Sequence, residues 1–278
     1  MIFIITLISL AIERFFHWGH LRHWRWFNTY QRWLGRSRIN QLPSSTLVIL
    51  SVLPPVLLIG LINYFLDDFL FGILKLAFGV LVLLYCFGPT NVWVQAYRCI
   101  NQLHKEEDPK MGIEYVQTEF GINPTDNSSS FHDAFTRAIF IGVYQRVFAV
   151  VFWFVLLGPI GAVLYRSIAL MRVESPLGLM QSAKTVQQWL DWIPVRIITF
   201  IFALGGHFTQ VFTSWKRSVF KSPEMNETLL TDCGIAALGV INGGTVPENG
   251  SAEKEAISLL DRAFIIALVA LAVIVLIL

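Results

Sequence analysis

Long apolar runs separated by shorter polar segments dominate the chain. The runs cover about residues 2–16, 46–66, 69–89, 147–165, 193–212 and 263–278. At a rise of about 1.5 Å per residue, roughly twenty apolar residues in a helix cross a hydrocarbon layer about 30 Å thick. The pattern therefore predicts an all-α integral membrane protein with four firm transmembrane helices. One or two further apolar helices are expected to be short or re-entrant.

The composition supports a membrane protein and leaves little for a separate soluble domain. Hydrophobic residues make up 55% of the chain, charged residues 14%, and the mean hydropathy is +0.59. A soluble domain carries about 25% charged residues. We therefore expect a single polytopic membrane domain over residues 1–278, with the lipid bilayer as its partner and no nucleic-acid partner. The oligomeric state is left open.

The remaining polar segments define loops. Residues 90–137 are expected to form a polar helical loop, residues 213–262 a polar loop, and residues 263–278 a C-terminal anchor helix. Arginines without acidic partners follow Glu13 in the segment before the second run, which places that segment in the cytoplasm by the positive-inside rule. The 90–137 loop then returns to the cytoplasm, whereas the sidedness of the second half stays open.

The fourth apolar run is bounded by Arg146 and Arg166. Their separation matches the thickness of the hydrocarbon layer, so the two arginines are expected to reach opposite faces of the membrane. Within this run, the segment 158–161, Gly-Pro-Ile-Gly, is expected to break or bend the helix, or to let a neighbouring helix approach closely.

The fifth run carries charges at membrane depth. Asp191 and Arg196 lie at its start and His207 near its end. On one continuous helix, Arg196 and His207 would share a polar stripe that could line a cavity for a phosphate or carboxylate. The alternative is structural: Asp191 caps the helix, and Arg196 neutralises an acid on a neighbouring helix. Glu13 and Arg14, which end the first run, are the expected partners of Arg196.

No metal site, cofactor or catalytic group follows from the remaining motifs. His17, His20 and His23 have a spacing that suits metal ligands, but the surrounding Trp and Arg residues favour a helix at the membrane surface. The cysteines are widely separated and are expected to be free thiols. No nucleophile signature or carboxylate pair for acid–base catalysis is evident.

Three segments resemble the AmpE family of inner-membrane proteins, whose gene accompanies that of the AmpD amidase. They are residues 3–14, residues 152–161, and residues 190–207 with the sequence Ile193-Pro-Val-Arg196. The resemblance covers nearly the whole chain. It implies a multi-pass protein of the bacterial inner membrane that acts in signalling between cell-wall turnover and β-lactamase induction.

The same segments resemble, more distantly, the cobalamin-biosynthesis family CobD/CbiB, which makes adenosylcobinamide phosphate. That family shares the Ile-Pro-x-Arg helix and a Gly-x-x-Gly-Ala-x-x-Tyr-Arg run, matched here by residues 158–166. It continues with an asparagine and an acid, whereas this chain reads Ser-Ile-Ala-Leu-Met-Arg after Arg166. The resemblance implies a shared scaffold and places an ATP-dependent ligase activity in doubt.

Two hypotheses for function, and a weaker third, follow. The first is a regulatory protein that binds an anionic or cell-wall-derived small molecule. The second is an enzyme of the cobalamin pathway, and the third is a small-molecule transporter. The residues expected to form the ligand site are Glu13, Arg14, Arg166, Asp191, Arg196 and His207.

Overall fold

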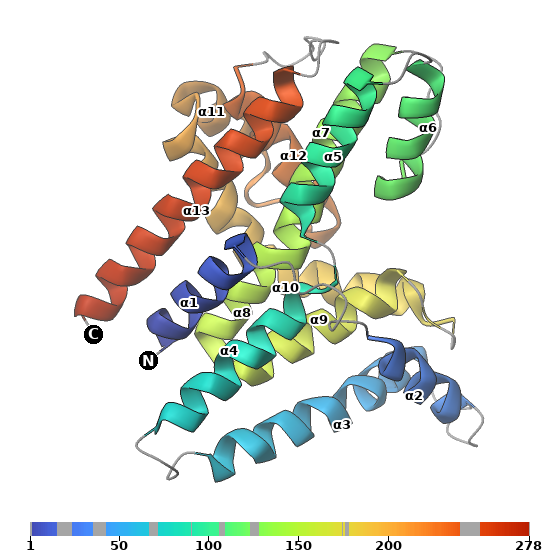
Figure 1. Ribbon diagram of the computed structural model, residues 1–278, viewed down its shortest axis with the longest axis vertical. Helices are drawn as coiled ribbons and strands as arrows, with labels where there is room; N and C mark the ends of the chain where they lie inside the picture. Colours follow the sequence, from blue (N-terminus) through green and yellow to red (C-terminus); the bar gives the residue numbers. More distant parts are fainter. Residues whose placement is uncertain are drawn as a thin grey trace. The chain divides into compact units, whose positions relative to one another are not determined.

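The computed structural model contains only helices in the residues that it describes, which confirms the all-α prediction (Figure 1). Those residues are 2–15, 24–35, 43–66, 72–89, 91–105, 109–122, 128–173, 175, 178–239 and 251–277. His17, His20, His23 and the Asp67-Asp68 connection lie outside them.

The chain divides into two compact units, and each is considered by itself. Unit 1 comprises residues 1–91 and 145–192. Its helices are α1 (Ile2–Phe15), α2 (Arg25–Gly35), α3 (Ser44–Phe65), α4 (Ile73–Phe87), α8 (Ala149–Leu157), α9 (Pro159–Val173) and the first part of α10 (Met180–Gly205).

Unit 2 comprises residues 92–144 and 193–278. It contains α5 (Val92–Lys105), α6 (Pro109–Phe120), α7 (Ser128–Val143), the second part of α10, α11 (Phe208–Ser218), the short 3-10 helix η5 (Pro223–Met225), α12 (Asn226–Ala237) and α13 (Ser251–Ile277). A π-helical turn, η4 (Tyr144–Phe148), lies between α7 and α8 in the sequence.

Four helical segments are long and apolar enough to cross a membrane, as the sequence predicts. They are Thr46–Phe65, Ile73–Leu103, Phe131–Leu157 and Ser251–Ile277, and the shorter apolar helix Ile2–Glu13 accompanies them. Two of the four therefore extend into residues 90–137, which the sequence pattern treats as a loop. The protein is thus a multi-pass membrane protein.

The fourth apolar run does not form one straight span. Helix α8 ends at Leu157, Gly158 has a φ of 66°, and α9 begins at Pro159 and packs back against α8. The turn can be this close only because Gly161 has no side chain, since a Cβ at this position would lie 2.2 Å from the carbonyl oxygen of Trp153. The expected break at this segment is confirmed. The expectation that Arg146 and Arg166 reach opposite faces is wrong, because the chain reverses between them.

Helix α9 is the centre of unit 1. It packs against α3, α4 and α8, and α1 packs against α4. Helix α2 is amphipathic and buries Phe27, while the indole of Trp26 donates a hydrogen bond of 2.7 Å to the hydroxyl of Tyr85. The described part of the expected surface helix is therefore tied to α4 through its aromatic side chains.

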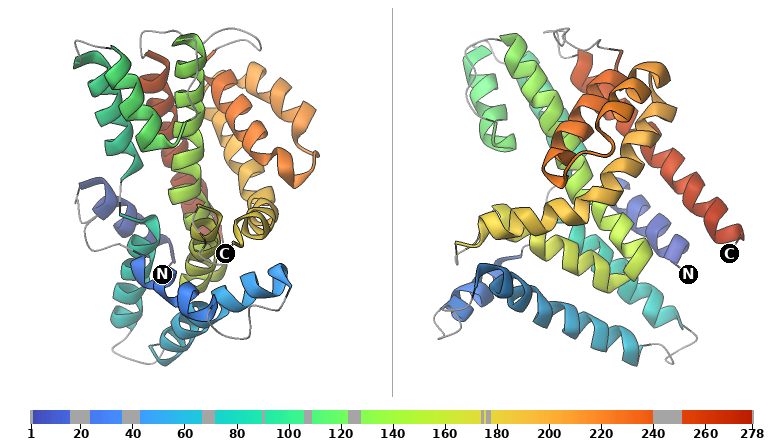
Figure 2. Two further views of the ribbon diagram at one scale, coloured as in Figure 1. Left: turned by 90° about the vertical axis from the view of Figure 1, so that its right-hand side faces the viewer. Right: turned by 180° about the vertical axis from the view of Figure 1, so that it is seen from behind.

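In unit 2, α7 packs against α12 and α13, and α11 packs against α12 (Figure 2). The region expected as a polar loop, residues 213–262, contains α12 and the first half of α13. Both are largely buried, with Ala263 the last buried residue of α13. Beyond Ala263, α13 exposes apolar residues such as Ile265, Val269 and Leu276. The role of this half as a C-terminal anchor stays a prediction.

The polar stripe expected along the fifth run does not continue on one helix. Helix α10 ends at Gly205, and His207 is the residue before α11, with a non-helical backbone (φ −76°, ψ 88°). A Cβ on Gly206 would lie 2.6 Å from the carbonyl oxygen of Ala237, and the backbone N–H of His207 donates to the same oxygen at 3.1 Å. The close approach to the end of α12 is the physical reason that the chain turns here.

Arg196 holds together the connection between α11 and α12. Its Nε donates to the carbonyl oxygen of Val219 at 2.6 Å, Nη1 to Oδ1 of Asn226 at 2.9 Å, and Nη2 to the carbonyl oxygen of Lys221 at 3.0 Å. The indole of Trp215 donates to the carbonyl oxygen of Arg196 at 3.4 Å. A buried guanidinium with these acceptors is satisfied by uncharged groups of its own unit.

We expect Arg196→Met to destabilise the protein by about 2–4 kcal/mol, because two backbone carbonyls and a buried amide would lose their donor. The free energy of unfolding in detergent micelles, measured by SDS titration, checks this value. The exposed Arg217 of α11 provides a matched control, and Arg217→Met should change stability by less than about 0.5 kcal/mol. Equal effects of the two substitutions would contradict the role assigned to Arg196.

Candidate functional site

Arg166 is the candidate with the clearest capacity to bind a ligand. It lies in the middle of α9, where its side chain is 8% exposed. Its Nε is buried without a hydrogen-bond acceptor in the described part of the chain. A Cβ on Gly88 would lie 2.5 Å from Nη2, and Gly88 has a φ of 90°. The glycine that ends α4 therefore leaves room for the guanidinium.

The charged side chain that acts on Arg166 is another cation, Arg146. Burial and, to a smaller extent, the positive charge of Arg146 lower the pKa of Arg166 to about 10, while the Cys86 thiol and the Tyr165 hydroxyl oppose the change. A buried cation next to another cation is unfavourable unless an anion or a hydrogen-bond acceptor compensates it. An oxyanion is the group that a planar guanidinium binds best.

Tyr165 and Asp191 form a separate buried pair next to Arg166 in the sequence. The hydroxyl of Tyr165 donates to Oδ1 of Asp191 at 2.9 Å, and the amide of Gln187 donates to the hydroxyl oxygen at 3.1 Å. Burial and the negative charge of Asp191 raise the pKa of Tyr165 well above its ordinary value. Asp191 therefore lies inside α10 as an acceptor between helices and does not cap it.

The structure distributes the six expected site residues between the two units. Glu13, Arg14, Arg166 and Asp191 belong to unit 1, and Arg196 and His207 to unit 2. Glu13 is buried at the end of α1, and its backbone oxygen accepts a hydrogen bond of 2.9 Å from Asn91. Arg14 lies in α1, but its side chain is outside the described atoms. The contact expected between Glu13 and Arg196 stays a prediction.

His207 is exposed and has a structural contact. Its ring faces Gly239, where a Cβ would lie 2.9 Å from Nε2. Gly239 has a φ of 82° and follows the end of α12. The imidazole thus covers the turn that begins after this helix.

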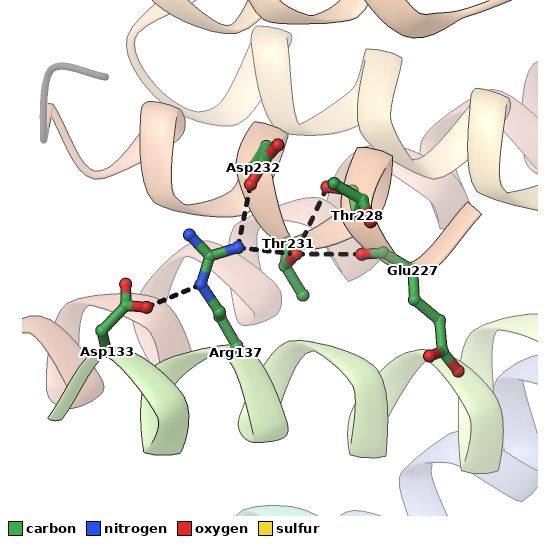
Figure 3. A network of polar contacts seen from close by, with 6 residues as sticks. All are labelled: Asp133, Arg137, Glu227, Thr228, Thr231 and Asp232. Carbon is green, nitrogen blue, oxygen red and sulfur yellow. Dashed lines mark hydrogen bonds and ion pairs between the residues drawn. The ribbon is translucent and has the colours of Figure 1, made fainter. Parts of the chain in front are cut away.

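A cluster of polar contacts that the sequence pattern did not single out joins α7 and α12 (Figure 3). Arg137 donates to Asp133 at 2.8 Å, to Asp232 at 2.8 Å and to the hydroxyl of Thr231 at 2.9 Å. Thr231 in turn donates to the backbone oxygen of Glu227 at 2.9 Å. The spacing of Asp133 and Arg137, four residues apart on a helix, was the only available signal. Because the described polar atoms pair with one another, the cluster stabilises the interface between the helices.

One further pair connects α7 and α13. Nδ1 of His132 lies 2.5 Å from Oε1 of Glu253, and the side chain of Glu253 is fully buried. Among the described residues, no group of three or more His, Cys, Asp or Glu side chains is arranged to hold a metal ion. The geometry of this pair alone therefore indicates a helix contact.

Two curated relatives are similar to part of the chain. The cobalamin biosynthesis protein CobD of Chromobacterium violaceum is 30% identical over 112 residues, which cover 38% of this chain and 36% of the relative. CobD of Stutzerimonas stutzeri is 26% identical over 129 residues, which cover 42% and 41% respectively. The chain therefore spans less than half the length of these relatives. No solved structure matches the chain significantly.

The match to a protein family is far more extensive. The family described as "Regulatory signalling modulator protein AmpE" matches residues 1–277. This match covers both units, all four candidate membrane spans and the segments that carry Arg166 and Arg196. The chain therefore belongs to the AmpE family of regulatory signalling modulator proteins.

Proposed function

We propose that this protein modulates signalling at the bacterial inner membrane, linking cell-wall stress to β-lactamase regulation, and that it does so by binding an anionic small molecule derived from the cell wall. Membership of a signalling-modulator family supports the regulatory part. The observation that carries the ligand is Arg166, a buried guanidinium whose Nε has no acceptor.

Of the expected site residues, Arg166 is therefore the centre of the proposal. Arg146 adds positive charge to its surroundings, and an incoming carboxylate or phosphate would relieve the repulsion between the two guanidinium groups. Asp191 contributes indirectly, because it orients Tyr165 on the residue before Arg166. Glu13 and Arg14 of unit 1, and His207 of unit 2, stay in the proposal as candidates for ligand contact.

Arg196 has a structural role in the proposal and is not assigned to ligand binding. Its three donor atoms are bonded to backbone and amide oxygens of its own unit, so it supports the fold around α11 and α12. We therefore assign ligand recognition to Arg166 and structural support to Arg196. The two arginines can be separated experimentally, because loss of a ligand contact and loss of stability have different readouts.

We expect soluble muropeptides, which carry several carboxylates, to raise the midpoint of thermal unfolding of the purified protein in lipid nanodiscs. A ligand at a hundred times its Kd adds about 2.7 kcal/mol to the stability of the native state. Arg166→Gln should abolish this increase, because the buried cation is removed while a polar side chain with an N–H donor is kept.

The matched control for this measurement is Lys184→Gln, which removes one positive charge from an exposed position of α10 in the same unit. This variant should keep the stabilisation by muropeptides. If Arg166→Gln and Lys184→Gln respond alike, the anion does not bind at Arg166. If neither the parent protein nor the variants respond, muropeptides are not the ligand, and a titration with inorganic phosphate then tests the site itself.

In cells, we expect Arg166→Gln to alter β-lactamase induction by a β-lactam antibiotic to the same extent as deletion of the gene. Membrane levels of the variant must equal those of the parent, measured by immunoblot of the membrane fraction. Lys184→Gln should leave induction unchanged. A normal response with Arg166→Gln at normal membrane level would disprove the link between this arginine and signalling.

A second function has one observation in its favour, the partial similarity to the two CobD proteins. If the chain were an adenosylcobinamide-phosphate synthase, the arginines would hold phosphate groups during amide formation. The residues after Arg166 lack the asparagine and the acid of the enzyme family's pattern. The resemblance supports a common scaffold more strongly than a common reaction.

We accordingly expect no cobinamide phosphate when the purified protein is given ATP, Mg²⁺, cobyric acid and aminopropanol phosphate. Mass spectrometry of the reaction mixture measures the product, and a CobD protein assayed in parallel serves as the positive control. Formation of the product above the no-protein background would favour the enzymatic function over the regulatory one.

A further inference from the structure

Helix α11 combines a buried face with an exposed aromatic face. Val211 and Ser214 are buried, and α11 packs against α12. Phe208 is 49% exposed and Phe212 is 39% exposed. At about 1.5 Å per residue, this helix is only about 16 Å long, far less than the roughly 30 Å of a hydrocarbon layer. It is therefore too short to cross a membrane, although it exposes two phenylalanines on one side.

The aromatic side chains of this region form a continuous row. Ring centroids of Phe208 and Phe212 are 5.6 Å apart, those of Phe212 and Trp215 are 6.0 Å apart, and both pairs are stacked. Phe200 of α10 extends the row, with its ring 6.0 Å from that of Trp215. A contiguous apolar surface of this kind marks a site of contact with another apolar phase.

Phe220, just after the end of α11, is the most exposed of the large hydrophobic side chains described, at 90%. Its position is nevertheless fixed, because Arg196 binds the carbonyl oxygens of Val219 and Lys221 on either side of it. An exposed phenylalanine held on a rigid backbone presents its ring without the entropy loss of ordering a loop.

Positive charge gathers where the aromatic row ends. Lys216, Arg217 and Lys221 are exposed, and α11 contains no acidic residue. Aromatic side chains on one face and cations next to them are the pattern of helices that lie in the plane of the membrane interface. There, the rings occupy the boundary of the acyl chains and the cations interact with lipid phosphates.

We propose that α11 and Phe220 form an interfacial docking surface for the anionic phospholipid headgroup layer, with the aromatic row at the acyl boundary and the three cations among the phosphates. This surface shares no residue with the proposed ligand site and does not depend on the proposed ligand. It gives Arg196 a defined role, because this arginine fixes the end of the docking surface.

The test places a single environment-sensitive fluorophore on introduced cysteines in a chain whose three native cysteines are changed to alanine. Phe212→Cys and Phe220→Cys report on the aromatic face. Thr213→Cys, one residue from Phe212 and also exposed, is the matched control on the polar side of the helix. Each labelled protein is placed in nanodiscs that contain lipids brominated on the acyl chain, which quench fluorophores at short range.

We expect quenching at positions 212 and 220 to be at least about threefold stronger than at position 213, since the aromatic face would lie at the acyl boundary. Equal quenching at positions 212 and 213 would overturn the proposal. Excimer formation between pyrene labels at position 220 in nanodiscs that hold two copies of the chain would also overturn it, because the surface would then join the two copies; nanodiscs that hold one copy give the monomer reference.

The role of the cations is tested by comparing nanodiscs of phosphatidylglycerol with nanodiscs of phosphatidylcholine. In the parent chain, quenching at position 220 should be stronger with the anionic lipid. The double variant Lys216→Gln/Arg217→Gln should lose this preference, whereas Lys184→Gln/Lys254→Gln, which removes the same charge elsewhere, should keep it. If both double variants keep the preference, these cations do not contact the headgroups, and the proposal of an anionic surface is wrong.

Discussion

A guanidinium buried among apolar side chains must be compensated, and this requirement governs both arginines that lie deep in the protein. The cost of burying an uncompensated charge exceeds that of most other local defects, so each buried arginine needs acceptors or an anion. Arg196 meets the requirement within its own unit, through two backbone carbonyls and the amide of Asn226. The Nε of Arg166 has no acceptor in the described part of the chain, and this difference separates a structural arginine from a candidate ligand-binding one.

The position of Arg166 depends on two glycines that allow the backbone of unit 1 to turn closely. Gly158 reverses the chain, so that α9 packs back against α8. Gly88 ends α4 with a positive φ and gives the guanidinium its space. A side chain at position 88 would occupy the place of Nη2, because its Cβ would lie 2.5 Å away. The turn before α9 and the end of α4 therefore shape the candidate site around an arginine in the middle of α9.

Much of the fold could be predicted from the chain because apolar length is a local property. The runs around Thr46–Phe65 and in the second half of α13 are apolar over their whole length, and the structure contains helices there. The break at Gly158-Pro159 was also predictable, since glycine and proline act on their own backbone. The expected position of Arg146 and Arg166 on opposite faces failed because residue counting assumes a straight helix. The same assumption failed for the polar stripe expected from Arg196 to His207, because α10 ends at Gly205 and His207 lies beyond it.

The sequence by itself determined the helical class, the membrane setting, the family and the residues to be considered for a site. These properties could be predicted because hydropathy, backbone preference and family motifs depend on residues that are close together in the chain. Only the tertiary structure decided which arginine is satisfied and which is not. That distinction rests on Val219, Lys221 and Asn226, which lie more than twenty residues from Arg196 in the chain. Hydrogen-bond acceptors that distant are brought to a side chain only by the packing of helices.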